Sequence, residues 1–128
     1  MRKIEFRAWL KKDKKMVEVK SIHFGTKKIM YGYSESSHCY GNVTCKFDDC
    51  ELMQFTGLTD KNGTKIFEGD ILKSPFDKKF FEVFYDECRF FVKTNRGTVL
   101  RGVQSAIDHY ELEVIGNIYD NPELLEAK

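Results

Sequence analysis

Apolar and polar residues alternate along many short stretches of this chain, and that alternation is typical of half-buried β-strands. In the first half of the chain the pattern predicts strands at residues 4–10, 16–19, 21–25, 29–33 and 45–49. In the second half it predicts strands at residues 51–56, 64–67, 71–73, 80–85, 90–94, 98–100 and 111–119. Short strands at this spacing favour a small barrel or sandwich over a helical bundle.

Two turns in the middle of the chain have clear sequence signals. Asn62-Gly63 predicts a tight turn, because both residue types tolerate a positive φ. In Glu68-Gly69-Asp70 we expect Gly69 to supply a second positive φ and Asp70 to accept hydrogen bonds from backbone amides. We therefore interpret Glu68 and Asp70 as residues that form the turn, and not as a catalytic acid–base pair.

Aromatic residues dominate the predicted meander at residues 73–103. We expect the phenylalanines and tyrosines of the second half to fill the interior of a compact, sheet-built cylinder. The alternative is an exposed aromatic platform for bases, peptide or sugar. Near the end of the chain, Asn121-Pro122-Glu123 predicts the start of one short helix. A further helical turn is expected at residues 105–110.

The composition indicates a soluble globular protein. The 128 residues are 41% hydrophobic and 32% charged, with a net charge of +1, and no apolar run is long enough for a membrane helix. Neither a secretory signal nor membrane association is expected. Residues 1–20 carry eight basic and three acidic side chains, whereas residues 104–128 carry one and six. This asymmetry reflects either solvated faces or self-association through complementary patches.

The cysteines and histidines do not form a recognisable catalytic or metal-binding motif. His38 with Cys39, Cys45 and Cys50 could be combined into a zinc site, but the cysteine spacings differ from those of a zinc knuckle. We expect free thiols in a reducing cytoplasm, no metal and no cofactor. A Cys–His pair formed from distant segments, as in a small hydrolase or redox enzyme, is the least favoured alternative.

Three segments together resemble a known family. They are residues 1–9, residues 51–71 with the sequence ELMQFTGLTDKNGTKIFEGDI, and residues 114–125 with the sequence VIGNIYDNPELL. Their order and spacing resemble the YopX family of phage and prophage proteins. The resemblance implies a mostly β fold, with a β-rich N-terminal region at residues 1–50. It also implies an SH3-like barrel with a C-terminal helical turn at residues 51–128. It implies no established activity and supplies no catalytic residues.

These observations favour a phage- or prophage-encoded binding or assembly module without enzymatic activity. We expect it to act in the bacterial cytoplasm through protein–protein contacts and to form homo-oligomers. The alternative is a nucleic-acid-binding accessory protein that uses a basic and aromatic face of the barrel. In that hypothesis Phe80, Phe81, Phe90 and Phe91 are interleaved with cations. The candidate nucleic-acid-binding residues are Lys78, Lys79, Arg89, Lys93, Arg96 and Arg101.

Overall fold

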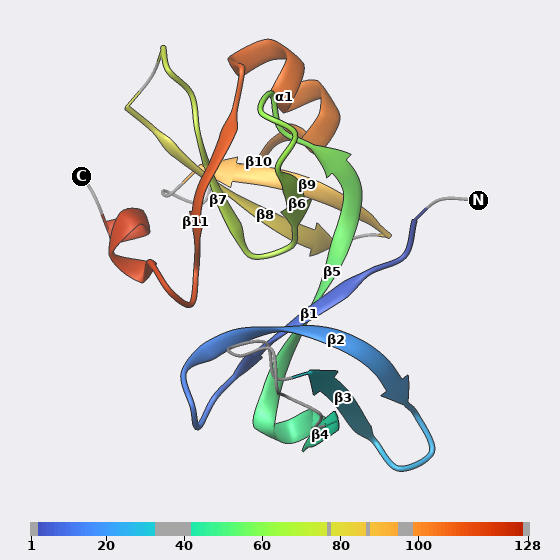
Figure 1. Cartoon of the computed structure of the whole chain (residues 1–128). Helices are drawn as coiled ribbons and strands as arrows, with labels where there is room; N and C mark the ends of the chain where they lie inside the picture. Colours follow the sequence, from blue (N-terminus) through green and yellow to red (C-terminus); the bar gives the residue numbers. More distant parts are fainter. Residues whose placement is uncertain (1–2, 33–41, 77, 87, 95–98, 127–128) are drawn as a thin grey trace. The chain divides into compact units, whose positions relative to one another are not determined.

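The computed structural model describes residues 3–32, 42–76, 78–86, 88–94 and 99–126. Within these ranges the protein is mostly β, and all strand pairs are antiparallel (Figure 1). The strands are β1 (Phe6–Leu10), β2 (Lys15–His23), β3 (Lys28–Gly32), β4 (Asn42–Lys46), β5 (Cys50–Thr59), β6 (Lys65–Phe67), β7 (Asp70–Lys73), β8 (Phe80–Asp86), β9 (Arg89–Thr94), β10 (Val99–Gly102) and β11 (Glu113–Asn117). The helices are α1 (Val103–Tyr110) and the short 3-10 helices η1 (Phe47–Asp49) and η2 (Pro122–Glu126).

The chain forms two compact units, and the boundary between them falls inside β5. We call Ile4–Gln54 the N-terminal unit and Phe55–Lys128, with which Met1–Lys3 groups, the C-terminal unit. The first part of β5 pairs with β1, and its last part pairs with β6. No helix in the described ranges has the length and apolar character needed to cross a membrane.

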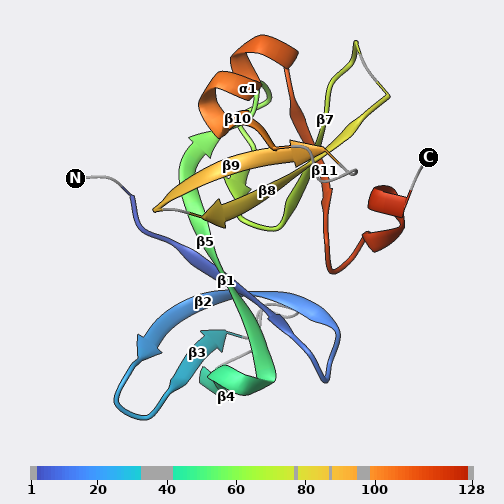
Figure 2. The same ribbon diagram turned by 180° about the vertical axis from the view of Figure 1, so that it is seen from behind.

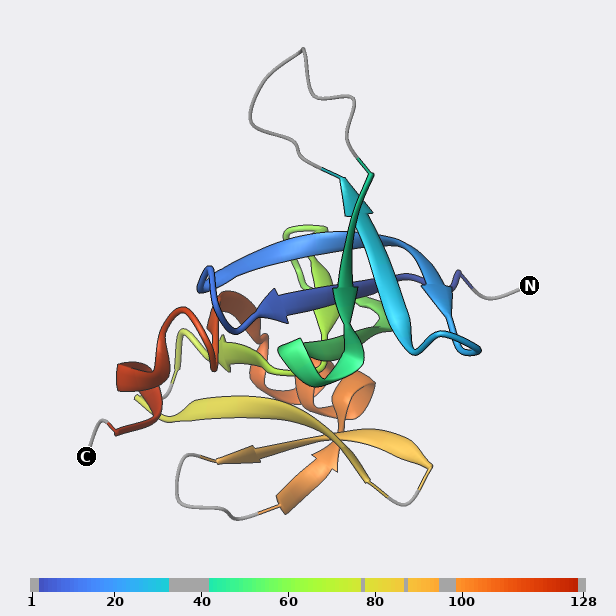
Figure 3. The same cartoon turned by 90° about the horizontal axis from the view of Figure 1, so that it is seen from below.

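The N-terminal unit is an antiparallel sheet in the order β4-β3-β2-β1-β5. Its core confirms the alternation predicted for the first strand, since Ala8 and Leu10 are buried together with Ile29 and Tyr31. Ile4, expected on the same face, is 59% exposed and lies outside the strand. Figure 3 shows the long, bent β2, which joins two strands predicted as separate. A register shift between residues 19 and 21 accompanies the bend, as a β-bulge does.

The C-terminal unit contains a second antiparallel sheet in the order β10-β9-β8-β7-β11 (Figure 2). In the described part of this unit, β10 and β11 are edge strands and the sheet does not close. Closure into an SH3-like barrel is therefore not confirmed. Helix α1 packs on one face of the sheet and completes a core of Ile66, Leu72, Phe81, Val83, Val92, Val103, Ala106, Ile107 and Leu112. The helix predicted at the C-terminus is the 3-10 helix η2, which begins at Pro122.

Both predicted turns of the C-terminal unit are confirmed. Gly63 and Gly69 have φ values of +84° and +87°. The Asp70 carboxylate is buried, and its Oδ2 accepts a hydrogen bond from the Phe67 amide at 2.8 Å. Asp70 thus closes the turn between β6 and β7, as its position after Gly69 predicted.

The prediction for the aromatic residues is right for one face of the second sheet and wrong for the other. Phe81 is fully buried, and Phe90 packs against the same core. Phe80, Phe84 and Phe91 are only partly buried and lie on the opposite face. The reason is the period of two along a strand, which sends neighbouring aromatic residues to opposite faces.

Candidate functional site

The structure brings together only part of the predicted basic set. Arg89 and Lys93 lie on β9, four residues apart on the outer face of the sheet. Lys78 and Lys79 are exposed in the segment before β8, and Arg101 lies on β10 opposite Val92. The sixth residue of the set, Arg96, lies outside the described residues. Among the six, Arg89 and Lys93 are the two that the described structure places on one face of the sheet.

Arg89 and Lys93 instead each cover an aromatic ring. The Phe84 and Phe91 rings are stacked, with centroids 5.6 Å apart and an interplanar angle of 26°. The Arg89 guanidinium lies 4.3 Å from the Phe91 centroid, and the Lys93 ammonium lies 4.8 Å from the Phe84 centroid. These distances are in the range of cation–π interactions. The pairing of β8 with β9 sets this arrangement, because it places Phe84 directly opposite Phe91.

The arrangement continues onto β7. The ammonium of Lys73 lies 5.8 Å from the centroid of Phe80, its register partner on β8. We call the resulting surface the cation–aromatic face; it consists of Lys73, Phe80, Phe84, Arg89, Phe91 and Lys93. Glu82 is paired with Lys93 in the sheet register, and Asp86 with Arg89. Since these two acids stand opposite two of the three cations of the face, the five charged residues together have a net charge of only +1.

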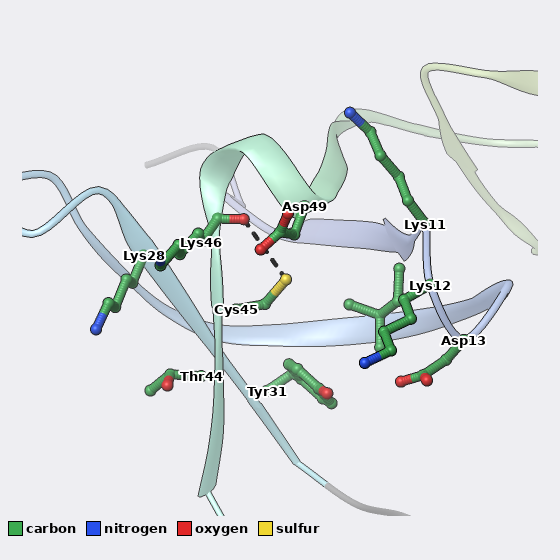
Figure 4. A pocket seen from close by; sticks show the side chains of 10 residues that line it. Lys11, Lys12, Asp13, Lys28, Tyr31, Thr44, Cys45, Lys46 and Asp49 are labelled. Atoms are coloured by element: carbon green, nitrogen blue, oxygen red, sulfur yellow. Dashed lines mark hydrogen bonds between the residues drawn. The ribbon is translucent and has the colours of Figure 1, made fainter.

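A second candidate site is a pocket in the N-terminal unit, with a volume of about 770 Å³. Its lining comes from five parts of the unit: β1, the β1–β2 turn, β3, β4 and η1. The lining residues are Leu10, Lys11, Lys12, Asp13, Lys28, Tyr31, Thr44, Cys45, Lys46 and Asp49. We call it the lysine-lined pocket. In Figure 4 the side chains of Lys12, Cys45 and Asp49 point toward the hollow, whereas Lys11 and Lys28 extend outward.

One of the four lysines already has partners. The Lys11 ammonium lies 3.4 Å from the Glu51 carboxylate and donates a hydrogen bond to the Asp48 carbonyl oxygen. Among the described residues, the ammonium groups of Lys12, Lys28 and Lys46 have neither a hydrogen bond nor an ion pair. Three cations around this pocket are therefore available to a ligand.

The cysteines near the pocket are free thiols. Cys50 is buried, Cys45 is half-buried and Cys88, in the β8–β9 turn, is exposed. Burial, together with the nearby Cys45 thiol and Glu51, raises the pKa of Cys50 to about 11. The described residues contain no group of three or more potential metal ligands, and His38 and Cys39 lie outside them.

Sequence reasoning missed parts of both sites for different reasons. The cation–aromatic face could have been found by parity along the strands, which separates Phe80 and Phe84 from Phe81. The lysines of the pocket carried no such signal, because Lys12 lies in the β1–β2 turn, whereas Lys28 and Lys46 are register partners on β3 and β4. Only the folded sheet brings them around one hollow.

The fold defines a class of small, β-rich proteins built on two antiparallel sheets. Within that class, the YopX protein family matches residues 5–126. The chain therefore belongs to the YopX family, as the three sequence segments indicated.

A solved structure is similar to this chain over nearly its whole length. The crystal structure of protein EF1440 from Enterococcus faecalis is 31% identical, with a TM-score of 0.70. The match covers 98% of this chain and 99% of that chain. No curated protein matches this chain.

Proposed function

We propose that this protein is a non-enzymatic binding and assembly module that associates with further copies of itself through the cation–aromatic face. The observation that carries the proposal is the stack of partly exposed Phe84 and Phe91 with Arg89 and Lys93. Aromatic residues and arginine are enriched in the buried centre of protein–protein interfaces, where they contribute most of the binding energy.

The charges of the two units support a second copy of the chain as the partner. The N-terminal unit contains nine basic and seven acidic residues, and residues 55–128 contain ten and thirteen. With Arg2 and Lys3, which group with residues 55–128, the two units have net charges of +2 and −1. Opposite charges on two surfaces of one chain favour association between copies.

Sedimentation velocity over a range of protein concentrations tests this proposal. We expect a concentration-dependent oligomer for the unaltered protein. The change Phe84→Ser removes one ring of the stack and should weaken self-association about tenfold or more. The matched control is Phe76→Ser, because Phe76 is 76% exposed in the segment between β7 and β8 and lies off the face.

Two outcomes would contradict the proposal. One is a monomer at every concentration, at low and at physiological salt. The other is an equal loss of association in the Phe84→Ser and Phe76→Ser proteins. Circular dichroism of both variants separates loss of association from loss of folding.

Nucleic-acid binding by the same face is the second candidate. It is favoured by the pairing of cations with aromatic rings, which single-strand-binding surfaces also use. It is disfavoured by Glu82 and Asp86, which stand opposite Lys93 and Arg89 and reduce the attraction for phosphates. If the face binds nucleic acid, a labelled single-stranded oligonucleotide at low salt will show a polarisation change that Phe84→Ser abolishes.

We also propose an origin and a cellular compartment for the protein. We infer a phage or prophage origin from the family resemblance of the three sequence segments. We infer action in the bacterial cytoplasm, because Cys45 and Cys50 are free thiols and reducing compartments maintain that state.

A further inference from the structure

The lysine-lined pocket combines three kinds of surface. Its apolar part is formed by Leu10 and Tyr31, which are 3% and 6% exposed and belong to the core of the N-terminal unit. Lysines from the β1–β2 turn and from the β3–β4 pair surround it. The carboxylates of Asp13 and Asp49 and the hydroxyl of Thr44 add hydrogen-bond acceptors.

The electrostatics of the pocket favour an anion. Four lysines and two aspartates give its lining a net charge of +2. Within the described chain, the ammonium groups of Lys12, Lys28 and Lys46 have no protein partner that a ligand would have to displace. Lys12 contributes most directly to the attraction for an anion, since its side chain points into the pocket (Figure 4).

The volume of the pocket and its hydrogen-bond acceptors restrict which class of anion can bind there. A volume of about 770 Å³ is in the range of small-molecule sites and exceeds what inorganic phosphate needs. A fatty-acid carboxylate would fill the apolar part, but it has no donors for Asp13, Thr44 and Asp49. A nucleoside phosphate has an anionic group, a flat ring that can lie on Leu10 and Tyr31, and N–H and O–H donors.

We propose that the lysine-lined pocket binds a nucleoside phosphate, with the phosphate near Lys12 and Lys46 and the base over the apolar part. The nucleoside phosphate is either a free nucleotide or one unit of a nucleic-acid strand, because both carry the same chemical groups. This site lies within the N-terminal unit and is independent of the assembly proposed for the cation–aromatic face.

Isothermal titration calorimetry at low salt, with the full chain, tests the site. The probes are inorganic phosphate, AMP, ATP and a twelve-nucleotide single-stranded DNA. For AMP or ATP we expect a dissociation constant of about 10–100 μM, as is typical for a ligand of this size. Inorganic phosphate should bind at least about tenfold more weakly, because it leaves the apolar part of the pocket empty.

A matched pair of variants connects binding to the pocket. The double change Lys12→Gln and Lys46→Gln should weaken nucleotide binding roughly twenty-fivefold, from about fivefold for each ion pair. The control is Lys14→Gln with Lys27→Gln, which removes two charges from exposed turn residues of the same unit that do not line the pocket. The control protein should bind like the unaltered protein.

The probes also identify the source of the nucleoside phosphate. Tight binding of AMP or ATP that depends on Lys12 and Lys46 supports a free nucleotide. The same dependence seen only with the oligonucleotide supports a unit of a strand. The proposal is overturned if no probe binds at millimolar concentration, if inorganic phosphate binds as tightly as AMP, or if the pocket and control variants bind equally. Sedimentation of the pocket variant, which retains the cation–aromatic face, shows whether assembly is unaffected.

Discussion

At the scale of single residues, Asp60 shows how one side chain can hold a turn and a distant strand together. It is buried, and its Oδ1 accepts hydrogen bonds from the amides of Asn62 and Thr64, both at 2.9 Å. Its Oδ2 accepts a third bond from the amide of Val114, also at 2.9 Å. The sequence predicted the turn from Asn62-Gly63. It gave no sign of the contact with β11, which lies 54 positions away.

The change Asp60→Asn should destabilise the C-terminal unit by about 2 kcal/mol, because the new NH₂ group meets the Val114 amide and leaves a buried donor without an acceptor. Urea unfolding measures the loss. The control Asp108→Asn affects an exposed carboxylate that accepts only from the Gln104 side chain, and it should cost less than about 0.5 kcal/mol. Equal losses in the two variants would refute the role assigned to Asp60.

The Cys50 thiol should resist alkylation in the folded protein. Raising its pKa from 9.0 to about 11 lowers its thiolate fraction at pH 8 about a hundredfold, and the thiolate is the reactive form. Mass spectrometry after iodoacetamide treatment should show Cys88 modified well before Cys50.

The same pKa shift predicts a dependence of stability on pH. The folded state holds the Cys50 proton more tightly than the unfolded state, so this stabilisation is complete below about pH 9. It is lost as the pH rises from there toward 11. Fast labelling of Cys50 at pH 8 in the folded protein would contradict both expectations.

At the scale of elements, local signals predicted most strands and turns, but not how strands continue or pair. The turn at Gly63 and the alternation in β8 follow from residue types alone. In contrast, β5 continues through Gly57, which has a φ of +89°, because a bulge there is compatible with pairing to β6. The register that sets Phe84 against Phe91 depends on contacts between strands, which a single sequence does not encode locally.

The turn between β5 and β6 should depend on the positive φ of Gly63. The change Gly63→Ala should cost about 1 kcal/mol of unfolding free energy, because alanine is strained at a φ of +84° although the space beside it is open. Gly25 has equally open surroundings without a positive φ, so Gly25→Ala should be neutral or slightly stabilising. Thermal unfolding of both variants tests this, and a neutral Gly63→Ala would contradict it.

At the scale of the whole molecule, the two units differ in the binding chemistry that we propose for them. The N-terminal unit has a basic pocket with an apolar floor, and the C-terminal unit has a sheet face of stacked aromatic rings and cations. Composition predicted neither, because the overall net charge of +1 conceals the opposite charges of the two units. On the outer face of β8 and β9, the side chains of Phe84 and Phe91 are only partly buried, and this is where we expect a partner to bind.

Site-specific photo-crosslinking tests the central claim, that copies of this chain meet at the cation–aromatic face, most directly. A benzophenone-bearing phenylalanine analogue at position 84 retains an aromatic side chain there, and the same analogue at position 76 is the matched control. The account predicts a crosslinked dimer from position 84, and little or none from position 76. Crosslinking that is equal at the two positions, or absent from position 84 at concentrations where the protein sediments as an oligomer, would contradict it.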